Sequence, residues 1–298
     1  MPDIGASVIA RLKNKAMESG RSLQLYMQLF CQEEFLRRLA LSAYADHLVL
    51  KGGLFIYSLT NFESRTTIDV DFLLRQLPSD IENVRRIVDD ILNTKSGHDF
   101  ITFESDGFET ISLHRKYKGI SFRIIGKIRN TKTPFKVDIG VGDVIVPKAD
   151  KRCIPVQLPE FTRPEISTYS LESTIAEKLD AILQRLELTS RMKDFYDIWY
   201  LSITFNFDGQ KLQDAIEQTF HNRGTSIDRE SLNKVISLSE HDGIQRNWRQ
   251  FILRMKLPAV EFSDVTRVIH LFLLPVCEAI THESQCLATW SASELGWR

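Results

Sequence analysis

LVLKGGLFIYSLTNFESRTTIDVDFLL, residues 48–74, is the stretch that says most about the architecture of this protein. It begins within a short apolar run, residues 47–51, that predicts a buried strand entering a tight turn at Gly52-Gly53. A short helix is expected at residues 54–59. Residues 66–74 are β-branched and apolar with acids at alternate positions, which predicts a second strand.

Two acids, Asp69 and Asp71, stand two residues apart in this second strand. Residues at that spacing point to the same face, so the two carboxylates project together. Like charges this close repel unless a cation lies between them, and Mg²⁺ prefers such oxygen ligands. The alternative is an exposed strand face with two solvated acids. The apolar neighbours Val70 and Phe72 argue against it, because they indicate a buried strand where unpaired acids are costly.

A third acid, Asp138, lies in residues 135–139, another apolar segment that predicts a strand. It could join the same metal site, whereas Asp143 is expected in a loop. Three carboxylates carried on strands are the arrangement that two-metal phosphoryl transfer needs. A Gly-Gly turn between strand and helix would present backbone N–H groups to a phosphate, although most such turns are only turns.

The predicted secondary structure changes about halfway along the chain. Residues 1–45 read as helical, and four β segments separated by Gly, Asn, Thr and Pro follow between residues 100 and 146. Helical patterns dominate from residue 171 onward. The sequence thus predicts an α/β half, residues 1–160, and a helical half, residues 161–298. The boundary lies in a stretch that contains Pro147, Pro155, Pro159 and Pro164; one long loop within a single core is an equal alternative.

The helical half carries two further groups of charged residues. Lys178 lies in a helix whose other face is apolar, where an exposed lysine with a buried stem is the ordinary interpretation. Asp194 and Asp197 are three residues apart and share a helix face. They could simply complement the dipole at a helix start.

Composition excludes several classes of protein. With 298 residues, 38 Lys+Arg against 39 Asp+Glu and 43% hydrophobic residues, the chain is neither disordered nor strongly basic. The four cysteines are scattered, with no C-x-x-C pair, which indicates free thiols in a reducing compartment. No apolar run approaches the roughly 18–20 residues that a membrane span needs. We therefore expect a cytoplasmic protein without a membrane partner.

One local stretch departs from this near-neutral balance. Residues 111–137 contain eight cations and no acid: Arg115, Lys116, Lys118, Arg123, Lys127, Arg129, Lys132 and Lys136. Such a stretch is a candidate surface for an RNA backbone. The alternative is a solvated sheet edge that lysines protect against aggregation, with the acids of residues 80–110 offsetting the charge.

Four motifs together resemble the AbiEii/AbiGii-type nucleotidyltransferase toxins, within the polymerase-β-like nucleotidyltransferase superfamily. They are residues 37–58 (RRLALSAYADHLVLKGGLFIYS), residues 64–74 (SRTTIDVDFLL), residues 136–143 (KVDIGVGD), and the pair ESTIAEKLDAI and SRMKDFYDIWYL at residues 172–182 and 190–201. Their order and spacing make the resemblance specific over roughly residues 10–205. It implies a bilobed α/β fold: a nucleotidyltransferase core with a mixed sheet, and a mainly helical C-terminal lobe.

The resemblance also implies roles for individual residues. Asp69, Asp71 and Asp138 would bind Mg²⁺, and all three would be catalytic, with Lys136 completing the family's Lys-x-Asp element. A second set would bind the nucleotide: Lys51, Gly52, Gly53, Arg65, Lys178 and Asp197. Lys178 and Asp194 would also be catalytic. The wider superfamily usually has Gly-Ser where this chain has Gly52-Gly53, so a serine contact to phosphate is not expected.

On this resemblance the protein would transfer a nucleotide from an NTP to an acceptor hydroxyl, in particular the 3′ end of tRNA. It would act as the toxin of a type IV toxin–antitoxin or abortive-infection system, with a cognate antitoxin as partner. A second interpretation keeps the reaction and changes the acceptor to a small molecule or a protein. A third is a binding module without catalysis.

Overall fold

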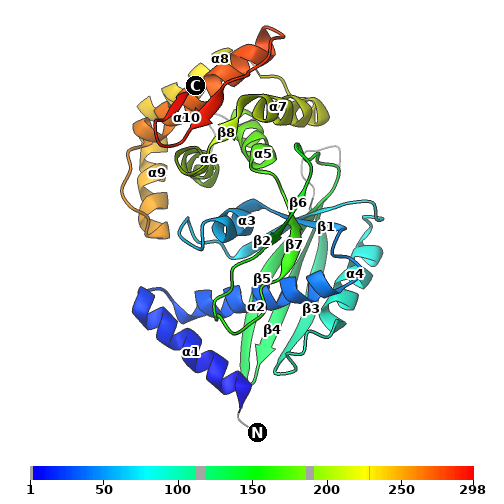
Figure 1. Cartoon of the computed structure of the whole chain (residues 1–298). Helices are drawn as coiled ribbons and strands as arrows, with labels where there is room; N and C mark the ends of the chain where they lie inside the picture. The colour runs from blue at the N-terminus through cyan, green and yellow to red at the C-terminus, as the bar shows by residue number, and fades with distance from the viewer. Residues whose placement is uncertain (1–2, 112–118, 186–190, 228) are drawn as a thin grey trace. The chain divides into compact units, whose positions relative to one another are not determined.

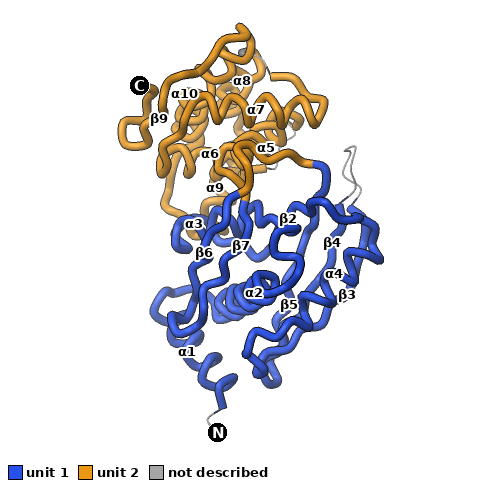
Figure 2. Tube along the Cα trace, turned by 45° about the vertical axis from the view of Figure 1, so that its right-hand side comes forward, with its two compact units in different colours: residues 1–142, 150–168 blue, residues 143–149, 169–298 orange. Residues whose placement is uncertain are grey.

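The computed structural model describes residues 3–111, 119–185, 191–227 and 229–298. The chain divides into two compact units (Figure 2). Unit 1 comprises Met1–Gly142 and Asp150–Thr168, and unit 2 comprises Asp143–Ala149 and Tyr169–Arg298. The boundary expected at residue 160 falls within unit 1, between two strands of its sheet.

Unit 1 is a mixed α/β structure (Figure 1). Its elements are α1 (Ile4–Ser19), α2 (Leu23–Leu41), β1 (Leu48–Lys51), α3 (Gly52–Leu59), β2 (Asp69–Leu74), α4 (Ile81–Asn93), β3 (Ile101–Ile111), β4 (Gly119–Ile128), β5 (Thr131–Gly140), β6 (Asp150–Cys153) and β7 (Glu165–Thr168). The seven strands form one sheet in the order β3-β4-β5-β2-β1-β7-β6. β2 pairs with β5, and β1 with β7, in parallel, while the other neighbours are antiparallel. The predicted α/β core with a mixed sheet is confirmed.

The core of unit 1 lies between α2 and one face of the sheet. The ring of Phe35 on α2 packs 6.0 Å from Phe72 on β2 and 6.3 Å from Phe135 on β5, measured between ring centroids. Because side chains alternate along a strand, this packing leaves Asp69 and Asp71 on the opposite face of the sheet.

Local backbone chemistry explains where the structure departs from the sequence pattern. The helical region at residues 1–45 is two helices, because Gly20 ends α1 in the left-handed conformation and Ser22 caps α2. The prediction that the first two of the four β segments after residue 100 are separate strands, one on each side of Gly107, was wrong. They form the single strand β3, with a register shift between Asp106 and Glu109. Gly107, at φ +66°, lies in this bulge instead of in a turn.

Unit 2 is mainly helical, as predicted. Its elements are α5 (Leu171–Leu183), α6 (Met192–Thr204), β8 (Phe207–Asp208), α7 (Gly209–Arg223), α8 (Arg229–Ser237), the 3₁₀ turn η2 (Leu238–Glu240), α9 (Asp242–Met255), α10 (Phe262–Thr281), β9 (Thr289–Ser291) and β10 (Gly296–Trp297). The small sheet β10-β9-β8 was not predicted. Among the described helices, none combines the length and apolar character needed to cross a lipid bilayer.

The segment Asp143–Ala149, which follows β5 in the chain, belongs to unit 2. It is held by backbone groups of Val146: the N–H donates to Ser173 Oγ at 2.7 Å, and the carbonyl accepts from Ser170 Oγ at 2.8 Å. The chain therefore passes between the units three times, after residues 142, 149 and 168.

Candidate active site

The acids of the predicted metal site lie on neighbouring strands of unit 1. In the parallel pair β2–β5, Asp71 stands opposite Asp138 and Asp69 stands opposite Lys136. In the antiparallel pair β1–β2, Lys51 stands opposite Asp71. All five residues therefore share one face of the sheet, as three carboxylates with two lysines among them.

Lys136 provides positive charge among these acids. Its Nζ is 2.9 Å from Asp138 Oδ2. Burial disfavours the ammonium, but the hydrogen bond to Asp138 and the negative charges of Asp138, Asp69 and Asp71 outweigh that effect and raise the pKa of Lys136. The other oxygen, Asp138 Oδ1, is buried and has no hydrogen-bond partner among the described residues. One oxygen of this carboxylate is thus left for a ligand.

The Gly-Gly turn packs directly against the acid strand. Gly52 has φ +68°, and a Cβ at this position would lie 2.2 Å from Asp71 Oδ2. A Cβ at Gly53 would lie 2.8 Å from Thr67 Oγ1 and 3.3 Å from the buried guanidinium of Arg65. The glycines allow α3, which begins at Gly52, to start against the carboxylate. This places a helix N-terminus, which attracts anions, beside the acids.

The three acids are candidate ligands for a divalent cation. In their present side-chain positions, the described His, Cys, Asp and Glu residues form no group of three or more that could hold a metal ion. The donor set nevertheless suits Mg²⁺, since it consists of three carboxylates on one face with a buried, unsatisfied oxygen at Asp138. A bound cation would take over the neutralising role of the Lys136 ammonium.

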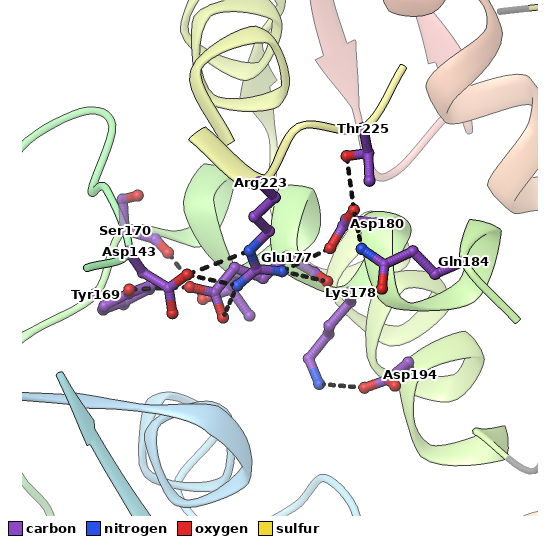
Figure 3. A network of polar contacts seen from close by, with 11 residues as sticks. Asp143, Tyr169, Ser170, Glu177, Lys178, Asp180, Gln184, Asp194, Arg223 and Thr225 are labelled. Carbon is purple, nitrogen blue, oxygen red and sulfur yellow. Dashed lines mark hydrogen bonds and ion pairs between the residues drawn. The ribbon is translucent and has the colours of Figure 1, made fainter. Parts of the chain in front are cut away.

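The charged residues of unit 2 form a second, buried group (Figure 3). Lys178 Nζ on α5 lies 2.9 Å from Asp194 Oδ1 and 2.5 Å from Asp197 Oδ2, both on α6. Only 11% of the Lys178 side chain is exposed, which excludes an ordinary surface lysine. Arg191 also pairs with Asp194.

The charge state of Asp194 follows from these partners. Burial would raise its pKa, but the positive charges of Lys178 and Arg191 and their hydrogen bonds lower it overall. The carboxylate is therefore ionised and holds the Lys178 ammonium in place.

A neighbouring network centres on Arg223, at the end of α7 (Figure 3). Its guanidinium lies 2.9 Å from Asp143, 3.2 Å from Glu177 and 2.9 Å from Asp180. Only 5% of the arginine side chain is exposed, and the acids around it raise its pKa despite burial. Sequence reasoning missed this network, because no local pattern links Arg223 to a loop acid 80 residues earlier.

Four of the five described cations in the basic stretch at residues 111–137 are paired with acids. Arg123 donates two hydrogen bonds to Asp106, each at 2.9 Å, and Lys127 pairs with Glu104 on the same neighbouring strand. Arg129 pairs with Asp3 at 3.3 Å. Arg115, Lys116 and Lys118 lie outside the described residues. Among the described cations of this stretch, only Lys132 is therefore not paired with an acid.

The predicted site residues thus fall into two groups, one in each unit. Unit 1 brings together the three acids, Lys51, the two glycines and Arg65. Unit 2 brings together Lys178, Asp194 and Asp197.

The chain is similar in fold to solved structures and matches a family model. MenT4, a nucleotidyltransferase toxin from Mycobacterium tuberculosis H37Rv, aligns with a TM-score of 0.55 and 15% identity, over 93% of this chain and 99% of its own. Two Helicobacter pylori structures, one of them JHP933, give TM-scores of 0.48 and 0.47 at 12% and 14% identity, over 89% and 88% of this chain and 100% and 95% of theirs. No curated protein sequence matches the chain. Residues 34–267 match the family described as "Nucleotidyl transferase AbiEii toxin, Type IV TA system". The protein therefore belongs to the AbiEii family of nucleotidyltransferase toxins of type IV toxin–antitoxin systems.

Proposed function

We propose that the protein transfers a nucleoside monophosphate from an NTP to an acceptor hydroxyl, and that the acceptor is the 3′ end of tRNA. The observation that carries the nucleotidyl transfer is the contact set of Asp71, which stands opposite Asp138 in the sheet and against Gly52 of the turn. A carboxylate pair next to a glycine turn and a helix N-terminus unites a cation site with a phosphate site.

In this proposal, unit 1 binds the triphosphate and directs the transfer. The backbone at Gly52 and Gly53, with Lys51 and Arg65, holds the phosphates. Asp69, Asp71 and Asp138 would hold Mg²⁺, which would offset phosphate charge and favour ionisation of the acceptor hydroxyl. The acceptor oxygen forms a bond to the α-phosphorus, the bond to the β-phosphate oxygen breaks, pyrophosphate leaves, and Asp138 accepts the hydroxyl proton.

Unit 2 contributes Lys178 to the nucleotide in the same proposal. Its two ion pairs, with Asp194 and Asp197, hold the ammonium in one orientation. A charged, ordered lysine can offset negative charge that develops on a departing phosphate. Asp194 then contributes to catalysis by positioning Lys178 through their ion pair. Asp197 contributes to nucleotide binding through its own ion pair with Lys178.

One observation favours a second candidate acceptor. Three of the four cations of β4 and β5, Arg123, Lys127 and Lys136, are ion-paired with acids, so these strands offer little uncompensated charge to an RNA backbone. A small molecule or a protein hydroxyl would not need such a surface.

The experiment is a label-transfer assay with purified protein, Mg²⁺ and each labelled NTP in turn. Parallel reactions receive unfractionated tRNA, a total protein extract or a small-molecule extract. We expect label on tRNA with the wild type and none with Asp71→Asn. Asp264→Asn, which changes an exposed acid on α10, is the matched control and should retain transfer. Label on protein or small molecules alone would replace tRNA as acceptor, and transfer by Asp71→Asn would refute the site.

The toxin role implies an antitoxin partner, and growth assays test it. We expect expression of the wild-type protein to arrest growth and Asp71→Asn to be harmless at equal expression. Co-expression of the adjacent gene should restore growth if it encodes the antitoxin. Arrest by Asp71→Asn would separate toxicity from nucleotidyl transfer.

A further inference from the structure

The exposed side of α9 concentrates positive charge in unit 2. Residues 242–256 contain four cations, Arg246, Arg249, Arg254 and Lys256, and one acid, Asp242. All four cations are exposed. Within the described ranges none of the four makes an ion pair; Arg249 donates only to the neutral Gln245, at 3.1 Å. In β4 and β5, by contrast, acids pair with Arg123, Lys127 and Lys136.

Folding does not account for these cations. α9 is held by its other side, where Ile244, Trp248, Phe251 and Ile252 are buried. The Trp248 ring packs 5.2 Å from Phe262, and its Nε1 donates to the Val260 carbonyl at 2.8 Å. The cations contribute nothing to this packing, and Arg246 and Arg249, three residues apart, repel each other by a few tenths of a kcal/mol. Their charge is therefore available to an external partner.

The pattern of the surface fits a phosphate backbone better than a protein. Arg246, Arg249 and Leu253 follow one stripe of the helix, and Arg254 lies beside it. From Arg246 to Arg254 the cations extend over about 12 Å of helix axis, roughly the length of three or four phosphates of one nucleic-acid strand. Leu253, at 76% exposure, is the large apolar side chain of the stripe. Protein interfaces are enriched in aromatic residues and Met as well as in Arg, and the exposed stripe of α9 contains no aromatic residue.

We propose that the exposed side of α9, through Arg246, Arg249, Arg254 and Lys256, binds the sugar-phosphate backbone of the RNA acceptor. The inference rests on the proposed use of RNA as acceptor. It transfers the role of RNA-binding surface from the paired cations of β4 and β5 to unpaired cations of the helical unit. Arginine suits this role because its guanidinium binds phosphate oxygens through two hydrogen bonds.

The test measures binding of unfractionated tRNA to the full chain, without NTP, at several salt concentrations. The variant carries Arg246→Gln, Arg249→Gln and Arg254→Gln together. Each phosphate contact contributes about 0.7–0.9 to the slope of log K against log salt, so the slope should become shallower by about two. Affinity at about 0.1 M salt should fall tenfold or more. The matched control, Arg123→Gln with Lys127→Gln and Arg129→Gln, removes three paired cations and should change affinity less than threefold.

Each outcome decides the proposal. A melting temperature close to that of the wild type shows that the α9 variant is folded, as its exposed side predicts. Unchanged tRNA affinity and slope in the folded variant would overturn the proposal and leave the α9 cations for an acidic protein such as the antitoxin. An equal loss of tRNA affinity in the control variant would also overturn the proposal, because binding would then depend on the net charge of the protein and not on α9. The proposed nucleotidyl transfer fails separately, through label transfer that does not depend on Asp71.

Discussion

The carboxylate of Asp71 lies in the space where any side chain at residue 52 would begin. A Cβ on Gly52 would be 2.2 Å from Asp71 Oδ2, and the backbone there has φ +68°. The glycine turn and the acid strand are therefore one structural unit, although 18 residues separate the two positions in the sequence.

Gly52→Ala should abolish most of the activity. The added methyl must displace the Asp71 carboxylate, and a displacement of about 1 Å at a reacting centre costs roughly 100-fold in rate. Gly20→Ala is the matched control, because Gly20 has nearly the same φ, +66°, but nothing within 4 Å of its Cβ position. In both variants the alanine must adopt a left-handed backbone conformation, which lowers the free energy of unfolding by about 1–2 kcal/mol. Steady-state transfer rates should separate them, and equal activity would show that the contact has no role.

Lys136→Met should make the protein more dependent on Mg²⁺. The variant leaves Asp69, Asp71 and Asp138 without the ammonium that pairs with Asp138. We expect a melting temperature a few degrees lower without metal, and a larger rise on adding Mg²⁺ than in the wild type. Lys132→Met, on the same face of β5, should behave like the wild type. A Mg²⁺ response unchanged by Lys136→Met would argue against a cation site at these acids.

Glu33 should make the stability of unit 1 fall as pH rises. The carboxyl is buried; burial raises its pKa to about 8, although a hydrogen bond from the Gln157 N–H and the charge of Arg37 oppose the shift. The folded state therefore holds a proton that the unfolded state releases above about pH 4.5. Between these values the free energy of unfolding should decrease by up to about 1.4 kcal/mol per pH unit through this group.

Glu33→Gln should remove this contribution and stabilise the protein relative to wild type at pH 8. The measurement is urea denaturation at pH 5, 6.5 and 8. Glu34→Gln provides the contrast: burial opposes the charge of Glu34, but Ser96, His98 and Arg37 lower its pKa overall. That variant should be less stable than wild type at neutral pH. A parallel pH profile for Glu33→Gln and wild type would contradict the prediction.

Arg223→Met should destabilise unit 2 strongly. It leaves Asp143, Glu177 and Asp180 without their common cation in a buried position, and removing one partner of a buried ion pair costs about 3–5 kcal/mol. Arg267→Met removes an exposed pair with Asp264 and should cost less than about 1 kcal/mol. Chemical denaturation followed by tryptophan fluorescence compares the two. Similar midpoints would mean that solvent screens the Arg223 network.

Much of unit 1 follows from local sequence. The alternation in Asp69-Val70-Asp71-Phe72 predicts a strand with both acids on one face, and the structure has that strand with Phe72 packed against α2. The turn at Gly52-Gly53 was also predicted from the sequence, because two glycines follow an apolar run. These features depend on the two-residue period of a strand and on the left-handed freedom of glycine, both properties of neighbouring residues.

The sequence by itself determined the division into an α/β half and a helical half, the shared face of Asp69 and Asp71, and the membership of a nucleotidyltransferase toxin family. Tertiary structure decided the rest: the place of Asp138 beside Asp71, the contact of Gly52 with that carboxylate, and the ion pairs of Lys178 with Asp194 and Asp197. It also decided which cations are paired, since Arg123 meets Asp106 only because β3 and β4 adjoin, while the α9 arginines meet no acid among the described residues. Strand pairing and helix packing join residues distant in the chain, so no period in the sequence encodes them.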